Sequence, residues 1–270
     1  MFCNRYWLKM GYKNRYGLSR YIREDIKQTV RQRDLFGCVI CGSIFFKYAH
    51  LNGGFAEAES HDPKDIVLLC ANHHDDLDIH YTLSEEEVRC QAKERAALKL
   101  SRIRGHYRMI KPVLHVGSNK AVNCYHFIAI QGKSILSISQ PEQRGGPFRL
   151  NADFQNSRGE QTVKIVNNEW EFRADNWDIR RSGARIYVYS AKRKIDLVMR
   201  PKAPNDFFIK KLDMEMNGYK LLCDGDSVSV HTPDGRHLQY IGTYAERCGM
   251  ALINIDPPST GSGLPLKQTP

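Results

Sequence analysis

Two short segments of the chain place four side chains at the spacing of metal ligands. Cys38 and Cys41 form a Cys-x-x-Cys segment followed by Gly42, and Cys70 and His73 form a Cys-x-x-His segment. Three thiolates and one imidazole suit tetrahedral structural zinc, and soft thiolates exclude Mg²⁺ or Ca²⁺. Four protein ligands leave no open position, so this zinc is expected to hold the fold and not to do chemistry. The alternative is three buried cysteines beside an unrelated histidine. A redox Cys-x-x-Cys is disfavoured because no βαβ pattern surrounds it.

Three helices are expected around these ligands. The first covers residues 19–34, where three apolar residues recur at i, i+4 and i+8 and form one stripe: Ile22, Ile26 and Val30. A short helix follows the second ligand pair and runs through Asp78. The third runs from Ser84 to about Arg104, because Ser84 and Glu87 form a capping box at its start.

Beyond residue 113 the sequence changes to short runs rich in Val, Ile, Tyr and Phe, separated by hairpin-type turns. Examples are the runs 135–139, 162–166, 185–189 and 195–199 and the turns Asn217-Gly218, Asp224-Gly225 and Asp234-Gly235. This pattern predicts a mostly-β domain that is a sandwich, a barrel or a solenoid. We therefore expect an α+β chain with domains over 1–110 and 111–255 and a flexible tail over 256–270.

Residues 20–80 resemble the HNH nuclease family, whose core is a ββα-metal fold. The segment from Tyr21 to Gly42 looks like the family's leading helix and first metal knuckle. Tyr48-Ala49-His50-Leu51 looks like the strand that carries the first histidine, 62–70 looks like the loop into the second knuckle, and His73-His74 opens the metal-bearing helix. The resemblance implies a zinc-stabilised ββα-metal module with flanking helices that hydrolyses phosphodiester bonds.

The resemblance also implies catalytic roles for three residues. His50 matches the general base that deprotonates the attacking water, a role that suits a neutral imidazole near neutral pH. His74 matches the residue that holds a catalytic Mg²⁺ or Mn²⁺ ion, which would stabilise the phosphate and the departing 3′-oxygen. Asp65 stands where the family's middle Asn usually stands and would orient the loop that bears His50.

The chain departs from the family pattern at two positions. Many members have a metal-binding Asp immediately before the base, where this chain has Ala49, and Asp65 replaces the usual Asn. Asp78 is the candidate for the missing metal ligand, because it lies four residues after His74 and on the same helix face. Weaker candidates lie in the preceding loop: Glu57, Glu59 and His61.

Each of these assignments has a structural alternative. His50 could be a satisfied structural histidine in an apolar strand. His74 could take the place of His73 on zinc. Asp78 could be a surface carboxylate or one that orients the helix.

The charge of the chain favours a polyanionic partner. Forty Lys and Arg residues against 30 Asp and Glu give a net charge of +10, and neutralised phosphates release counterions. The cations concentrate near the start of the chain. The alternative to nucleic-acid binding there is a solvated arm that binds no partner. We expect five of them to contact DNA, with RNA left open: Arg20, Arg23, Lys27, Arg31 and Arg33.

The sequence has no apolar run of about 18 residues and no apolar signal-peptide stretch, so the expected location is the cytoplasm, with no membrane partner. Five further cysteines are scattered singly, and each is expected to be a small buried hydrophobic residue and not half of a disulfide. We predict a metal-dependent DNA endonuclease. By analogy with bacterial HNH proteins that have β-rich C-terminal regions, it would act in restriction or phage defence.

The β-rich domain is expected to supply targeting, regulation or homo-oligomerisation. A stacking or phosphate-binding surface could form from Trp170, Phe172, Trp177 and Arg180-Arg181, although such tryptophans are more often core. Two alternatives remain for the whole chain. One is a zinc-knuckle protein that binds nucleic acid without cutting it. The other is a nuclease gated by a small molecule or protein bound to the β domain.

Overall fold

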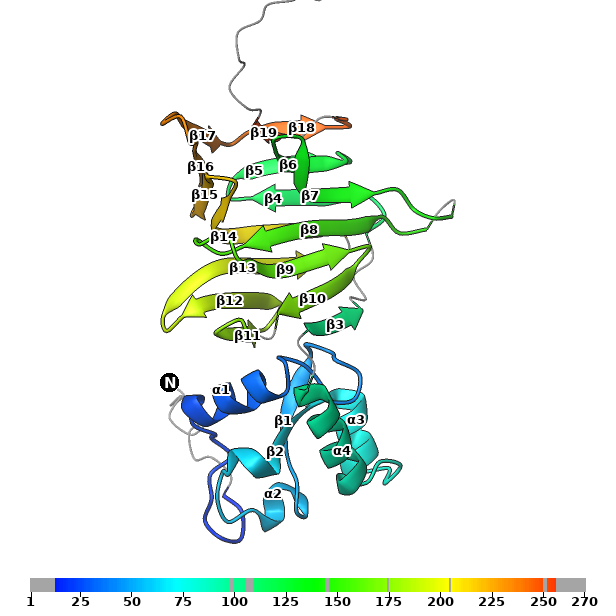
Figure 1. Cartoon of the computed structure of the whole chain (residues 1–270). Helices are drawn as coiled ribbons and strands as arrows, with labels where there is room; N and C mark the ends of the chain where they lie inside the picture. Colours follow the sequence, from blue (N-terminus) through cyan, green and yellow to red (C-terminus); the bar gives the residue numbers. More distant parts are fainter. Residues whose placement is uncertain are drawn as a thin grey trace, which may run out of the picture. The chain divides into compact units, whose positions relative to one another are not determined.

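The computed structural model describes residues 13–97, 100–104, 109–143, 146–173, 175–203, 205–249 and 252–255 (Figure 1). The chain forms two compact units. The first comprises residues 1–106, 162–164 and 168–196, and the second comprises 107–161, 165–167 and 197–270. The division of the chain into domains 1–110 and 111–255 stays a prediction.

The first unit contains the helices and a small hairpin. Its elements are α1 (Glu24–Arg33), β1 (Phe46–His50), α2 (Gly54–Glu57), the 3-10 turn η2 (Pro63–Asp65), β2 (Ile66–Cys70), α3 (Ala71–Asp78), α4 (Glu85–Ala96), β3 (Leu100–Arg104), β10 (Glu169–Arg173), β11 (Asp178–Ser182) and β12 (Arg185–Ala191). Antiparallel pairs join β1 to β2, β3 to β10 and β11 to β12.

The expected helices are present with two changes of boundary. The first begins at Glu24 instead of residue 19, because the backbone at Arg23 is extended. The capping box of Ser84 and Glu87 is confirmed at the start of α4. The continuation of that helix to residue 104 is wrong: α4 ends at Ala96, and residues 100–104 form a strand. Pairing of this segment with β10 overrides its local preference for helix.

Strand β2 is buried on both faces, which explains its unbroken apolar sequence. Val67 and Leu69 face a core that includes Leu51, Leu77 and Val88. On the opposite face of β2, Ile66 and Leu68 pack against Val30 of α1 and against Ile22, which precedes that helix. Phe46 and Tyr48 of β1 pack against the same cluster. The β1–β2 hairpin is therefore held between α1 on one side and α3 and α4 on the other.

The second unit is built almost entirely of strands. They are β4 (Val113–Val116), β5 (Asn119–Val122), β6 (His126–Ile130), β7 (Lys133–Ser139), β8 (Arg149–Gln155), β14 (Asp206–Met216), β15 (Tyr219–Asp224), β16 (Ser227–His231), β17 (His237–Ile241), β18 (Tyr244–Glu246) and β19 (Ile253–Ile255), with β9 (Gln161–Val166) and β13 (Lys194–Lys202) divided between the units.

These strands form two sheets in the second unit. One has the order β19-β6-β7-β8, and the other has the order β13-β14-β15-β16-β17. Strands β4, β5 and β18 extend the second sheet from β14. Strand β14 also contacts β8 of the first sheet. The mostly-β character predicted for this region is confirmed. The turn at Asn217-Gly218 is confirmed, with both residues left-handed.

Among the described residues, no helix has the length and apolar character needed to cross a membrane.

The tight packing beside the first cysteine pair gives a test of the fold. A Cβ on Gly37 would lie 2.3 Å from the Gly42 carbonyl oxygen, so backbone would have to move. We expect Gly37→Ala to lower the free energy of unfolding by about 1–3 kcal/mol, measured by urea unfolding with zinc present. Gly249→Ala is the control, because a Cβ there meets nothing within 4 Å. Equal stability of the two variants would contradict the packing described.

Candidate metal centre and adjoining pocket

The loop between α1 and β1 is folded so that two thiols come together. The Gly42 amide donates to the Cys38 carbonyl (2.8 Å), and the Cys38 amide donates to the Ser43 carbonyl (2.8 Å). Gly42 has φ of 78°, a conformation that glycine adopts without steric cost. The Val39 amide donates to the Leu68 carbonyl (2.9 Å), so the loop is fastened to β2.

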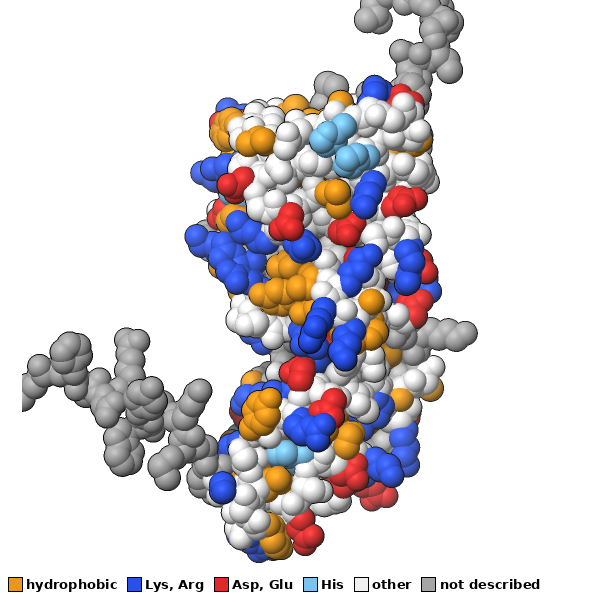
Figure 2. All heavy atoms as spheres, turned by 90° about the vertical axis from the view of Figure 1, so that its left-hand side faces the viewer, with side chains coloured by type: hydrophobic (Ala, Val, Ile, Leu, Met, Phe, Trp, Pro, Cys, Tyr) orange, Lys and Arg blue, Asp and Glu red, His pale blue; other side chains and the backbone are white. Residues whose placement is uncertain are grey.

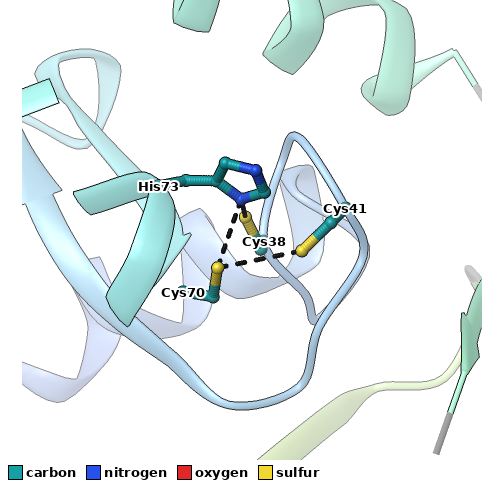
Figure 3. A group of neighbouring side chains, drawn as sticks. All are labelled: Cys38, Cys41, Cys70 and His73. Carbon is teal, nitrogen blue, oxygen red and sulfur yellow. Dashed lines mark hydrogen bonds between the residues drawn. The ribbon is translucent and has the colours of Figure 1, made fainter. Parts of the chain in front are cut away.

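Cys38, Cys41, Cys70 and His73, here called the Cys3His cluster, can hold a metal ion. Their ligand atoms all lie within 4.8 Å of one another (Figure 3). Nδ1 of His73 lies 3.4 Å from Cys38 Sγ and 3.2 Å from Cys70 Sγ, and the Cys41 and Cys70 sulfurs are 3.8 Å apart. Tetrahedral zinc would place two sulfurs about 3.8 Å apart and a sulfur and a nitrogen about 3.6 Å apart. The residues therefore fit a zinc ion.

The cluster favours anionic sulfur even without a cation. A hydrogen bond from Cys41, assisted by backbone amides, lowers the pKa of the Cys38 thiol to about 4. The same hydrogen bond and burial raise the pKa of Cys41. The two sulfurs thus share one proton, which a divalent ion would displace.

The cluster also settles which of the two neighbouring histidines belongs to it. His73 lies within it, whereas His74 does not. The alternative in which His74 takes the place of His73 is therefore wrong, because α3 turns successive side chains in different directions.

His74 lines a pocket with the predicted base. This pocket, called the His50 pocket, has a volume of about 840 Å³, and its lining includes His50, His74, Asp78, Arg20 and Glu85. All of its lining residues belong to the first unit. Among the described residues, the Cys3His cluster is the one group of three or more potential ligands with atoms within 4.8 Å of one another. The His50 pocket thus gathers four predicted site residues, and it does not close them into a second cluster of that kind.

His50 is 9% exposed and is held by a chain of two hydrogen bonds. Its Nε2 lies 2.9 Å from Nδ1 of His61, and Nε2 of His61 lies 2.8 Å from the carbonyl oxygen of Ser19. A carbonyl only accepts, so neutral His61 donates from Nε2 and accepts at Nδ1. His50 must then donate from Nε2, which leaves its Nδ1 without a proton.

The surroundings of His50 favour the neutral ring. Burial, followed by the charges of His61 and Arg20, lowers the pKa of His50 to about 4, against an opposing effect of Asp65. The sequence indicates His61 only as a weaker candidate for a metal ligand. Its role as the partner of His50 depends on contacts across 11 residues, which no local motif reports.

Asp65 contacts the loop that follows His50. Its carboxylate accepts from the side-chain amide of Asn52 (Nδ2, 2.9 Å) and from the Arg89 guanidinium (3.2 Å). Its carbonyl accepts from the Leu51 amide (2.8 Å). Glu85 holds the same loop by accepting from the amides of Asn52 (2.6 Å) and Gly53 (2.8 Å).

His74 and Asp78 face each other along α3. Nδ1 of His74 lies 3.2 Å from Oδ2 of Asp78, and both are partly exposed. With Nδ1 next to Asp78, Nε2 is the ring atom left for a metal. Glu57 pairs with Arg15 instead.

Two of the five predicted DNA-binding cations are engaged inside the protein. Arg31 is 4% exposed and donates to Asp178 (2.7 and 2.9 Å), Tyr48 and Glu24. Arg33 donates to both oxygens of buried Asp34 and to the Pro63 carbonyl (2.6 Å). These contacts use donors that a phosphate contact would need, and the assignment of both residues as phosphate contacts stays a prediction.

The other three cations lie nearer the surface. Arg20 is exposed and stacks over Phe55 (4.8 Å), Arg23 pairs with Asp25, and Lys27 lies over the rings of Tyr21 and Tyr48. On the face drawn in Figure 2, Lys and Arg side chains mix with acidic and hydrophobic ones and form no unbroken basic surface.

The aromatic surface considered for the β-rich region is not formed as a unit. Trp170 and Phe172 are buried in the core. Trp177 is half-buried, and its carbonyl accepts from Gln28 and Gln32 of α1.

Comparisons of this chain with models of protein families, with curated proteins and with solved structures find no match.

Zinc content provides a direct test of the Cys3His cluster. We expect about one equivalent of zinc per chain in purified protein, measured by atomic absorption. Cys70→Ser should lose most of this zinc, because three ligands leave the tetrahedral site open. Cys90→Ser is the matched control, since Cys90 is also a free thiol but lies on α4, outside the cluster. Equal zinc in both variants would remove the cluster as the metal site.

Proposed function

We propose that the chain is a metal-dependent endonuclease of the HNH type that hydrolyses phosphodiester bonds, with DNA as substrate. The observation that carries the proposal is the shared lining of the His50 pocket by His50, His74 and Asp78. The order of the motifs along the chain also supports the proposal. Cys-x-x-Cys at 38–41 is followed by Ala-His at 49–50, by Cys-x-x-His-His at 70–74 and by Asp78. On this proposal β1, β2 and α3 are the ββα-metal core.

His50 acts as the general base. The hydrogen bonds through His61 to Ser19 fix its tautomer, so its Nδ1 lone pair is the one that can take a proton from water. Its depressed pKa keeps it unprotonated at neutral pH. The depressed pKa also makes it a weaker base, and the fixed orientation offsets this loss.

His74 and Asp78 would hold the catalytic divalent ion, which supplies charge stabilisation for the phosphate and the leaving oxygen. Asp78 orients the His74 ring through Nδ1. Arg20 adds positive charge to the pocket wall, where its stacking on Phe55 limits the guanidinium's freedom.

Asp65 and Glu85 hold the loop that follows His50. Asn52, Gly53 and Gly54 are all left-handed, so this turn needs external support. The two carboxylates supply it by accepting from the Asn52 side chain and from the amides of Asn52 and Gly53. An Asp at position 65 therefore meets the accepting half of the role that the family's Asn would have.

Loss of cleavage in a His50 variant tests the proposal. Wild-type protein with zinc and added Mg²⁺ or Mn²⁺ is expected to nick supercoiled plasmid. His50→Ala should slow nicking by about 10²–10⁴-fold, because it removes the side chain proposed to take the proton from water. His80→Ala is the control, since His80 is exposed and does not line the pocket.

Absence of nicking with every metal, while plasmid binding persists, would contradict the proposal. That result would favour the zinc-knuckle protein that binds nucleic acid without cutting it. Weak wild-type cleavage that rises strongly when a small molecule or a partner protein is added would favour a gated nuclease.

The pH dependence of cleavage tests the role of His61. With its pKa at about 4, His50 stays neutral down to pH 5.5, so its protonation should lower the rate by less than twofold between pH 7.5 and 5.5. A histidine with the ordinary pKa of about 6.5 would lower it about tenfold over that range. His61→Gln removes the interaction with His61 that lowers the pKa of His50, so the decline should move to higher pH.

His61→Ala also removes the acceptor for His50 Nε2 and should slow the reaction at pH 7.5. The single-turnover nicking rate measures both effects. A His61→Gln profile identical to that of the wild type would show that His61 does not tune His50.

A further inference from the structure

A second pocket adjoins the His50 pocket and has no role in the mechanism above. Its volume is about 220 Å³, and side chains of α1, β1 and β11 line it. We call it the flanking pocket. Tyr48 lines both pockets, so they meet at this side chain. All of the residues that line the flanking pocket belong to the first unit.

The strand β1 sets the spacing between the two pockets. Phe46, Tyr48 and His50 alternate along β1 and so point to the same face. Phe46 and Tyr48 line the flanking pocket, and Tyr48 and His50 line the other. Residues two apart in a strand are about 7 Å apart, so Phe46 and His50 are separated by about 13 Å. One strand of B-form DNA advances about 3.4 Å per nucleotide, so this distance corresponds to a few nucleotides.

The flanking pocket has an excess of positive charge. Four cations line it: Lys27, Arg31, Arg180 and Arg181. Arg31 and Arg180 are compensated, since both pair with Asp178 and Glu24. Within the described part of the chain, neither Lys27 nor Arg181 has an ion-pair partner. Lys27 lies over Tyr21 and Tyr48, and Arg181 lies over Phe45 at 4.3 Å.

The pocket also presents a hydroxyl donor. Arg31 donates to the Tyr48 oxygen (2.6 Å), so the hydroxyl proton of Tyr48 is not used in that bond. Burial raises the pKa of Tyr48, which keeps the proton in place. Two cations and a hydroxyl that donate into one small pocket match the oxygens of a phosphate group.

We infer that the flanking pocket binds a backbone phosphate of the nucleic acid a few nucleotides from the phosphate cut at His50. Lys27, Arg181 and Tyr48 would be its donors. The inference rests on the proposed function, because it takes nucleic acid as the substrate of the adjoining pocket. It adds that β11, more than 120 residues beyond β1 in the chain, contributes directly to substrate binding.

Salt-dependent binding tests the inference. The probe is a fluorescent 20-base-pair DNA duplex, and the protein is full-length His50→Ala with zinc, so that cleavage does not interfere. Each phosphate contact contributes about 0.9 to the slope of log affinity against log salt concentration. Adding Lys27→Ala and Arg181→Ala removes the contact to this one phosphate, so it should reduce that slope by about 0.9 and weaken binding on the order of tenfold at 0.1 M salt.

The matched control carries Lys47→Ala and Lys93→Ala, which remove the same total charge. Lys47 lies on β1 but on the opposite face, and Lys93 is exposed on α4. Neither residue lines either pocket. The control should lose less than half as much slope. A variant with Lys27→Arg and Arg181→Lys keeps both charges and should bind like the parent, which separates charge loss from misfolding.

An unchanged slope in the Lys27 and Arg181 variant, with the duplex still bound and cut by wild type, would overturn the inference and leave the proposed function standing. An equal loss in the control would also overturn it, because the effect would then reflect net charge alone. If the parent binds no duplex and the wild type cuts none, the proposed function and this inference both fail.

Discussion

The hairpin of β1 and β2 is the constraint on which the candidate site depends. Its register pairs Phe46 with Cys70 at one end and His50 with Ile66 at the other. The Cys3His cluster therefore sits at one end of the hairpin and the candidate base at the other. Helix α3 begins immediately after Cys70 and rises about 12 Å over its eight residues, close to the length of β2. A helix of this length can carry a metal-binding side chain back from the cluster toward His50.

The Cys3His cluster and the two small cores stabilise this hairpin together. The core on one face of β2 includes Cys38, Val39 and Leu77 and so merges with the metal knuckle. The polar network at the end of α1 supplies further links. The Asp34 carboxylate accepts from the Leu68 amide (2.9 Å), and Arg95 of α4 donates to the Asp34 carbonyl (2.8 Å). A metal ion in the knuckle would thus stiffen the same strand that positions His50.

The parts of the site that were predictable from sequence are those in which short spacing determines geometry. The Cys-x-x-Cys and Cys-x-x-His pairs, the capping box at Ser84 and the extent of α3 all depend on contacts within a few residues. The fate of Arg31 was not predictable, because its partner Asp178 is 147 residues away. The His50–His61 contact and the pairing of β3 with β10 were not predictable for the same reason. Each joins segments that only the tertiary fold brings together.

Side chains alternate between the two faces of β1, and this gives a physical reason why Ala49 stands where many HNH nucleases have a metal-binding Asp. His50 lines the pocket, but Ala49 is 2% exposed and belongs to the core with Val67 and Leu69. A carboxylate at position 49 would be buried among apolar side chains, where an unpaired charge is costly. In this chain the residue before the candidate base therefore serves the core. If a catalytic ion binds at His74, its protein ligands must come from the pocket side, and α3 already presents Asp78 there.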